Sequence, residues 1–215
     1  LSELLREPVV VIGASRTDSG VHAEGAVAVF DTENRMPADK ICFALNQRLP
    51  EDIRVLQSDE VPLTWHPRKQ NCVKTYEYRI LNREFPLPAY RFNSHFTYRK
   101  LDVERMRQAA AYLIGEHDFQ SFCAAGAQVK TTVRTIYALD VEKQGDLIIL
   151  RITGNGFLYN MVRIIAGTLM KIGQGDWEPE RIPEILAGCD RQLAGPLCHA
   201  RGLTLMEIHF KGEKG

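Results

Sequence analysis

The chain has 215 residues, of which 45% are hydrophobic and 25% charged. These proportions are typical of globular proteins, and a chain of this length can bury a sizeable core without disulfides or a structural metal. They exclude collagen, a coiled coil and wholesale disorder. No apolar run approaches the ~20 residues that span a bilayer, and no signal segment opens the sequence, so we expect a cytoplasmic protein.

Basic and acidic residues balance at 27 each, but they are distributed unevenly. Residues 1–62 carry 6 basic and 11 acidic groups, residues 63–107 carry 10 and 4, and residues 108–215 carry 11 and 12. A neutral protein is a poor non-specific binder of polyanions, although the central block could form a local patch for phosphates. Composition alone favours an ordinary solvated surface.

The five cysteines include no C-x-x-C pair, and the six histidines show no H-E-x-x-H spacing. We therefore expect reduced, structural thiols and no metal site.

The predicted elements begin with the end of an amphipathic helix at residues 1–8, stopped by Pro8. Because the sequence starts without Met, we expect that an N-terminal piece precedes it. Prolines 62 and 67 mark a linker where the charge balance changes sign. This predicts an N-terminal subdomain at 1–62 and a C-terminal subdomain at 63–215. The first subdomain is predicted to contain strands at 9–13, 26–31 and 53–61 and a helix at 39–49.

The second subdomain is predicted to alternate strands with helices, which indicates an α+β fold with a largely antiparallel sheet. A short turn at residues 144–145 indicates a hairpin, and the apolar stripe over 158–172 predicts the clearest helix, with Arg163 well off that stripe. The predicted strands are 73–81, 131–142, 146–154 and 202–210, and the predicted helices are 102–115, 158–172 and 179–187.

A polar loop at residues 13–23 lies between two predicted strands and carries Arg16 and Asp18. A turn entered from a buried strand can hold one side chain rigidly at a sheet edge. The alternative is a polar turn in which Asp18 caps its own backbone, and the local pattern alone favours that alternative.

The strand at 73–81 places Lys74, Tyr76 and Tyr78 on one face. Two tyrosines beside a lysine suit stacking on a nucleobase next to a phosphate. Without further information, a half-buried aromatic face is the favoured interpretation.

Gly154 and Gly156 end a predicted strand and permit an unusual turn into the long helix. The free N–H groups at that helix start favour an anion, and Arg163 could point at the same anion. More often, an arginine in such a position is simply exposed on the surface.

Taken together and in this order, these segments resemble the TruA family of tRNA pseudouridine synthases. The catalytic loop of that family reads G-R-T-D-A-G-V-H-A, and residues 15–23 here read S-R-T-D-S-G-V-H-A. The sequence departs from the family at His199, where a proline is usual, and lacks the family's first strand and most of the following helix. The likeness continues through residues 66–68, 76–78, 117–122, 133–136, 157–173, 194–196 and 202–203.

The resemblance implies the pseudouridine synthase fold, with two ferredoxin-like subdomains sharing a largely antiparallel sheet and flanking helices. It implies that Asp18 is the essential aspartate and that Arg163 is the ion partner that keeps it ionised. Arg16 would hold the flipped nucleotide or its backbone, the ring of Tyr76 would stack on the uracil, and Leu203 would wall the pocket. Each of these roles is an expectation.

The resemblance further implies a cytoplasmic homodimer that isomerises uridine to pseudouridine in the anticodon stem-loop of tRNA, at positions 38–40. An isomerisation needs no redox cofactor, metal or nucleoside triphosphate, so no cofactor is expected.

Two alternatives remain open at this point. The first is a non-catalytic ferredoxin-like module that binds RNA on an exposed face carrying Tyr76 and Tyr78, as an RRM does. The second is a hydrolase that uses Asp18 with His22 or His66 as a base. Tritium release from tRNA labelled at C5 of uridine discriminates the synthase from the first alternative. The second requires a small-molecule pocket and a partner that orients the histidine, and the sequence identifies neither.

Overall fold

The structure is a computed structural model, and it describes residues 1–126 and 129–211. The chain forms two compact units, one made of Leu1–Arg16 and Val27–Gln70, and the other of Thr17–Ala26 and the chain from Asn71 onward. The sequence predicts a boundary near residue 63, and the chain changes unit for the third and last time between Gln70 and Asn71. The sequence analysis did not anticipate that the segment Thr17–Ala26 belongs with the later part of the chain.

The first unit contains short elements around a small core that includes Leu5 and Ile41. Strand β1 (Ile12–Gly13) pairs antiparallel with β3 (Ala28–Val29), and both are shorter than the strands that the sequence predicts. The unit's helices are α1 (Ser2–Leu5) and α2 (Ala38–Asn46).

The predicted strand at 53–61 is wrong, because no residue of this segment lies in a strand. Side-chain hydrogen bonds hold the segment along α2 instead. The amide of Asn46 binds both the N–H and the C=O of Val55, each at 2.8 Å, and Ser58 Oγ accepts a hydrogen bond from the backbone N–H of Cys42 at 2.9 Å. Backbone groups that are satisfied in this way are not available to a neighbouring strand.

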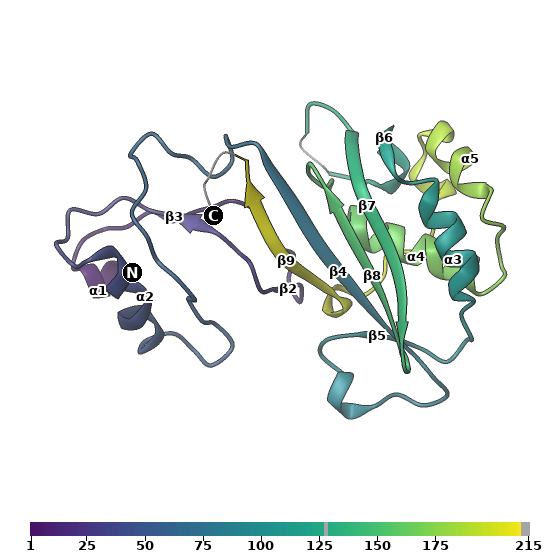
Figure 1. Cartoon of the computed structure of the whole chain (residues 1–215), viewed down its shortest axis with the longest axis horizontal. Coiled ribbons are helices and arrows are strands. Elements are labelled where there is room, and N and C mark those ends of the chain that lie inside the picture. The colour runs from purple at the N-terminus through teal and green to yellow at the C-terminus, as the bar shows by residue number, and fades with distance from the viewer. Residues whose placement is uncertain (127–128, 212–215) are drawn as a thin grey trace. The chain divides into compact units, whose positions relative to one another are not determined.

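The second unit is built on a sheet with strand order β2-β9-β4-β8-β7-β6, which Figure 1 shows from one side. The pairings are antiparallel, except that β2 runs parallel to β9 and the short β5 runs parallel to β4. The predicted α+β fold with a largely antiparallel sheet is therefore confirmed. The strands are β2 (His22–Ala23), β4 (Cys72–Asn82), β5 (His95–Thr97), β6 (Gly115–Asp118), β7 (Val133–Gln144), β8 (Leu147–Gly154) and β9 (Leu203–Phe210).

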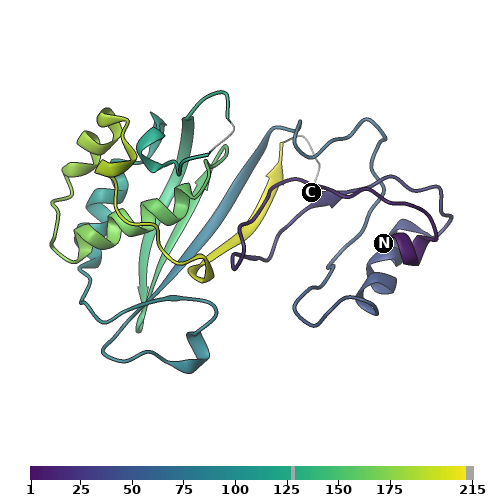
Figure 2. The ribbon, with the colours of Figure 1, turned by 180° about the vertical axis from the view of Figure 1, so that it is seen from behind.

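Helices α3 (Val103–Ala111) and α4 (Met161–Gly173) pack against each other and cover the sheet, as seen from both sides in Figures 1 and 2. Helix α3 begins where the Asp102 side chain accepts hydrogen bonds from two backbone N–H groups. Helix α5 (Arg181–Gly188) follows α4. No helix in the described part of the chain is both long and apolar enough to cross a membrane.

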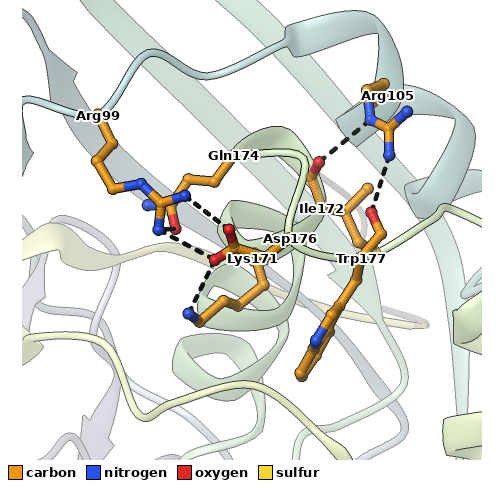
Figure 3. A network of polar contacts seen from close by, with 7 residues as sticks. All are labelled: Arg99, Arg105, Lys171, Ile172, Gln174, Asp176 and Trp177. Carbon is orange, nitrogen blue, oxygen red and sulfur yellow. Dashed lines mark hydrogen bonds and ion pairs between the residues drawn. The ribbon is translucent and has the colours of Figure 1, made fainter.

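A polar network fastens the end of α4 to the segment that leads into α3 (Figure 3). Arg99 donates two hydrogen bonds to the carboxylate of Asp176, at 2.6 and 3.0 Å, and Lys171 donates a third at 3.0 Å. Arg105 donates to the carbonyl of Trp177 at 2.9 Å. The hydrogen bonds from Arg99 and Lys171 hold the pKa of Asp176 well below its ordinary value, so this carboxylate stays ionised.

Candidate active site

Asp18 begins a tight turn at the edge of the large sheet. The backbone N–H of Val21 donates to the carbonyl of Asp18 at 3.0 Å, and Gly20, two residues after Asp18, has φ +81°. The third residue of a type II turn takes such a positive φ, which glycine adopts without strain. The turn and its position at the sheet edge therefore hold Asp18 in place.

Strand β2 anchors this loop to the sheet immediately after the turn. His22 and Ala23 pair in parallel with Thr204 and Leu205 of β9, and Glu24 N–H donates to the carbonyl of Leu205 at 2.8 Å. At Gly25 the two backbones approach so closely that a Cβ would lie 2.4 Å from the carbonyl oxygen of Met206. A strand of only two residues is thus held by its fit against β9.

The structure brings Asp18 together with Arg163 of α4. Arg163 Nη1 lies 3.3 Å from Asp18 Oδ2, the same Nη1 donates to Asn160 Oδ1 at 2.7 Å, and Nε donates to the carbonyl of Cys198 at 2.8 Å. The Arg163 side chain is 13% exposed and the Asp18 side chain 37%. A mostly buried cation, anchored by two neutral acceptors, therefore lies against a carboxylate that is partly exposed to solvent.

Asn160 orients Arg163 through an unusual backbone conformation. It precedes α4 with φ 61° and ψ 9°, in the left-handed region that asparagine tolerates better than most residues. Its side chain does not cap its own helix but accepts the hydrogen bond from Arg163, three residues later. The sequence analysis missed Asn160, although an asparagine directly before a helix is a signal worth examining.

Tyr76 and Leu203 lie on neighbouring strands of the same sheet, and each is only 7% exposed. The pairing of β4 with β9 shifts register between Thr75 and Tyr76, and such irregularities redirect side chains. The ring of Tyr76 meets the ring of Phe157 edge-on, with centroids 5.1 Å apart. Any contact of Tyr76 or Leu203 with a substrate is thus limited to a small exposed part of each.

The burial of Tyr76 and Tyr78 does not favour the RRM-like alternative. Tyr78 is fully buried and donates its hydroxyl to the carbonyl of His199 at 2.8 Å. The structure thus offers no open tyrosine face on β4 for bases to stack on.

The short segment at 198–202 connects several parts of the site. The carbonyl of Cys198 holds Arg163, the carbonyl of His199 holds Tyr78, and a Cβ added at Gly20 would lie 3.5 Å from Ala200 Cβ. Burial raises the pKa of Cys198 to about 11, so its thiol is neutral at physiological pH. Burial also raises the pKa of Tyr78 well above its ordinary value, so the phenol stays a hydrogen-bond donor. The sequence carries no signal for these contacts, because every residue has a carbonyl.

His95, a neutral histidine, lies next to the 198–202 segment. The ring of His95 has its centroid 5.2 Å from that of His199 and 6.4 Å from that of Tyr78. Burial, together with smaller electrostatic contributions from His199 and Arg201, lowers the pKa of His95 to about 4.

Arg16, the remaining predicted site residue, ends the first stretch of the first unit and has an exposed side chain. Its predicted contact with a nucleotide stays a prediction. Within residues 1–126 and 129–211, no group of three or more His, Cys, Asp or Glu residues could hold a metal ion.

Comparison with known proteins identifies the family. Residues 2–68 and 109–211 match the family model described as tRNA pseudouridine synthase. The chain is 47% identical over 211 residues to the tRNA pseudouridine synthase A of Brevibacillus brevis, and equally to that of Ruminiclostridium cellulolyticum, covering 98% of this chain and 86% of each relative. It is 46% identical to the enzyme of that name from Bacillus pumilus, over 95% of this chain and 83% of the relative. The resemblance noted in the sequence is thereby confirmed, and the chain belongs to the tRNA pseudouridine synthase family.

Proposed function

We propose that this protein isomerises uridine to pseudouridine in tRNA and that Asp18 is its catalytic carboxylate. The observation that carries the proposal is the pairing of a reachable carboxylate on a rigid turn with a buried, doubly anchored guanidinium. The names of the relatives supply the reaction and the tRNA substrate.

The reaction breaks the N1–C1′ bond of uridine and forms a C5–C1′ bond. Asp18 serves either as the nucleophile at C1′ or as the carboxylate that takes the proton from C2′ to give a glycal-type intermediate, returning it when the C5–C1′ bond forms. In either case uracil leaves with the electron pair of the N1–C1′ bond, turns, and bonds through C5. The proton on C5 is then lost and N1 gains one, so atoms and electrons balance without an external reagent. Arg163, whose Nη1 lies 3.3 Å from Asp18 Oδ2, would orient this carboxylate in both routes.

The other site residues are proposed to receive an extruded nucleotide. A uridine inside a stem must leave the base stack before Asp18 can reach its C1′ atom. The exposed edges of Tyr76 and Leu203 would enclose the uracil, with the Tyr76 hydroxyl assisting removal of the C5 proton, and Arg16 would hold the nucleotide or its backbone. The support is the match of these positions to the family's motifs.

On the family likeness, we also propose that the target is the anticodon stem-loop, with positions 38–40 as the modified sites. The same likeness supports a homodimeric assembly and a cytoplasmic location. Pseudouridine mapping by mass spectrometry, on tRNA from cells with and without the protein, tests the target. Size-exclusion chromatography with light scattering tests the dimer, and a strictly monomeric full-length protein would remove that part of the proposal.

The central test measures tritium release from tRNA labelled at C5 of uridine. We expect release by the wild-type protein, none by Asp18→Asn, and nearly equal tRNA affinity for the two. Asp140→Asn, an exposed aspartate on β7, is the matched control and should behave as the wild type. Near-normal turnover by Asp18→Asn would refute the assignment, and a wild-type protein that binds tRNA without releasing tritium would support the RNA-binding alternative.

A further inference from the structure

We propose that Phe92, with Arg91, forms a stacking platform for a base of the substrate RNA, one that neighbours the nucleotide bound at Asp18. This inference rests on the proposed function and extends it to a residue that neither the sequence motifs nor the reaction chemistry single out.

The platform lies in the segment between β4 and β5, which contains the short helical turn η1 (Pro88–Tyr90) and projects past the end of the sheet (Figure 1). The Phe92 residue is 66% exposed, and the guanidinium carbon of Arg91 lies 4.3 Å from the centroid of its ring. A single exposed apolar side chain is ordinary on a protein surface, so exposure alone would carry no argument.

Both residues of the platform are anchored through their backbone carbonyls. The backbone carbonyl of Phe92 is hydrogen-bonded to His22 Nε2 at 2.6 Å, and the carbonyl of Arg91 accepts a hydrogen bond from Arg201 Nη1 at 3.2 Å. His22 belongs to the loop that carries Asp18, and Arg201 belongs to the 198–202 segment that holds Arg163. The platform is thus attached to the same two pieces of backbone that form the candidate active site.

These attachments place the platform within reach of a nucleotide next to the target. The turn from Asp18 to Val21 keeps their Cα atoms within about 7 Å of each other, and His22 follows directly. An RNA strand whose target uridine is bound at Asp18 would therefore pass beside Phe92. The neighbouring base, already unstacked from the extruded uridine, would have a free face to place on the ring.

The chemistry of the segment suits RNA. Exposed aromatic rings and arginine planes are the usual stacking partners of unpaired bases, and arginine adds attraction for the phosphate. Residues 83–100 contain four basic residues, Arg83, Arg91, Arg99 and Lys100, and one acidic residue, Glu84. Arg83 and Arg99 pair with Asp146 and Asp176, so the charge that favours an acidic partner comes from Arg91 and Lys100. The polyanionic tRNA is the acidic partner that the family implies.

The first test compares Phe92→Leu, which removes the ring, with Phe92→Tyr, which keeps it. We expect Phe92→Leu to raise the Kd and KM for tRNA about tenfold and to leave the single-turnover rate at saturating enzyme within about twofold. Phe92→Tyr should match the wild type. Phe85→Leu is the matched control, because Phe85 is 65% exposed in the same segment, whereas His22 and Arg201 are hydrogen-bonded to the carbonyls of Phe92 and Arg91.

The second test locates the base through a double-mutant cycle. Stem-loop substrates carry an abasic residue on the 5′ or the 3′ side of the target uridine. We expect one of the two abasic substrates to abolish the difference in Kd between the wild type and Phe92→Leu. A difference that persists with both substrates would overturn the assignment to a neighbouring base.

The remaining outcomes are also decisive. If the wild type is active and Phe92→Leu binds tRNA as tightly as Phe85→Leu, the platform is wrong and the proposed function stands. If Phe92→Leu and Phe92→Tyr lose affinity equally and both lower the Tm, Phe92 has a structural role and the platform is again wrong. If the wild type releases no tritium, the proposed function itself fails. Arg91→Gln should reduce the slope of log Kd against log salt by about 0.7 if Arg91 neutralises a phosphate, and an unchanged slope excludes that contact.

Discussion

The guanidinium of Arg163 lies 3.3 Å from the carboxylate of Asp18, although 145 positions of sequence separate the two residues. Its hydrogen bonds to Asn160 and Cys198 are shorter, at 2.7 and 2.8 Å, but both acceptors are neutral. A cation that is mostly buried needs a counter-charge, and Asp18 supplies it. The same contact therefore compensates the buried charge of Arg163 and holds its guanidinium against the Asp18 carboxylate at the sheet edge.

Replacing Arg163 by lysine tests whether geometry matters as well as charge. Lysine keeps the positive charge but lacks the planar fork that serves Cys198, Asn160 and Asp18 together. We expect Arg163→Lys to lower kcat about 100-fold in the tritium-release assay, as the loss of one electrostatic contact in an active site typically does. Arg48→Lys, at an exposed position in the turn that follows α2, is the control. A kcat within twofold of the wild type would show that charge alone suffices.

Asn160 offers a test that separates backbone conformation from side-chain function. Glycine adopts the left-handed conformation freely but offers no acceptor to Arg163, whereas alanine lacks the acceptor and is also strained there. Both Asn160→Gly and Asn160→Ala should lower kcat, and Asn160→Ala should be about 1 kcal/mol less stable than Asn160→Gly. Urea unfolding measures the stabilities. Full kcat in Asn160→Gly would mean that Cys198 alone orients Arg163.

Tyr78 is predicted to act as a positioning residue. Removing its hydroxyl in Tyr78→Phe leaves the carbonyl of His199 without this donor, and a lost buried hydrogen bond of this kind costs about 1–3 kcal/mol. Because the 198–202 segment also holds Arg163, we expect kcat to fall while the Kd for tRNA stays unchanged. Tyr137→Phe, at a half-exposed position on β7, should change neither. Lower stability with an unaltered kcat would assign Tyr78 a purely structural role.

His95 should make the stability of the protein depend on pH in the mildly acidic range. Burial lowers its pKa from 6.5 to about 4, so between these values the unfolded chain binds a proton that the folded chain excludes. The contribution of His95 is therefore fully present above pH 6.5 and is lost as the pH falls toward 4. We expect the free energy of unfolding of His95→Gln to vary less with pH in that window than that of the wild type. Parallel curves from urea titrations at several pH values would contradict the prediction.

Much of the second unit could be predicted because its elements are long and regular. The apolar stripe over 158–172 spans four turns of helix and correctly predicted α4. The strands of the central hairpin, β7 and β8, were predicted to within a few residues. The short elements could not be predicted in this way. Strand β2 has two residues, too few for any periodic pattern. The segment at 53–61 looks like a strand, but the backbone of its Val55 is hydrogen-bonded to the side chain of Asn46 in α2.

The sequence by itself determined the family and the residues most worth testing, because the loop around Asp18 and the residues around Tyr76, Arg163 and Leu203 carry that information in their side chains. Only the tertiary structure decided that Thr17–Ala26 joins the second unit, that Asn160 and the carbonyl of Cys198 orient Arg163, and that Phe92 is attached beside the site. The physical reason is that these arrangements depend largely on backbone groups, which every residue shares. A sequence cannot specify which carbonyl meets which donor until the chain has folded.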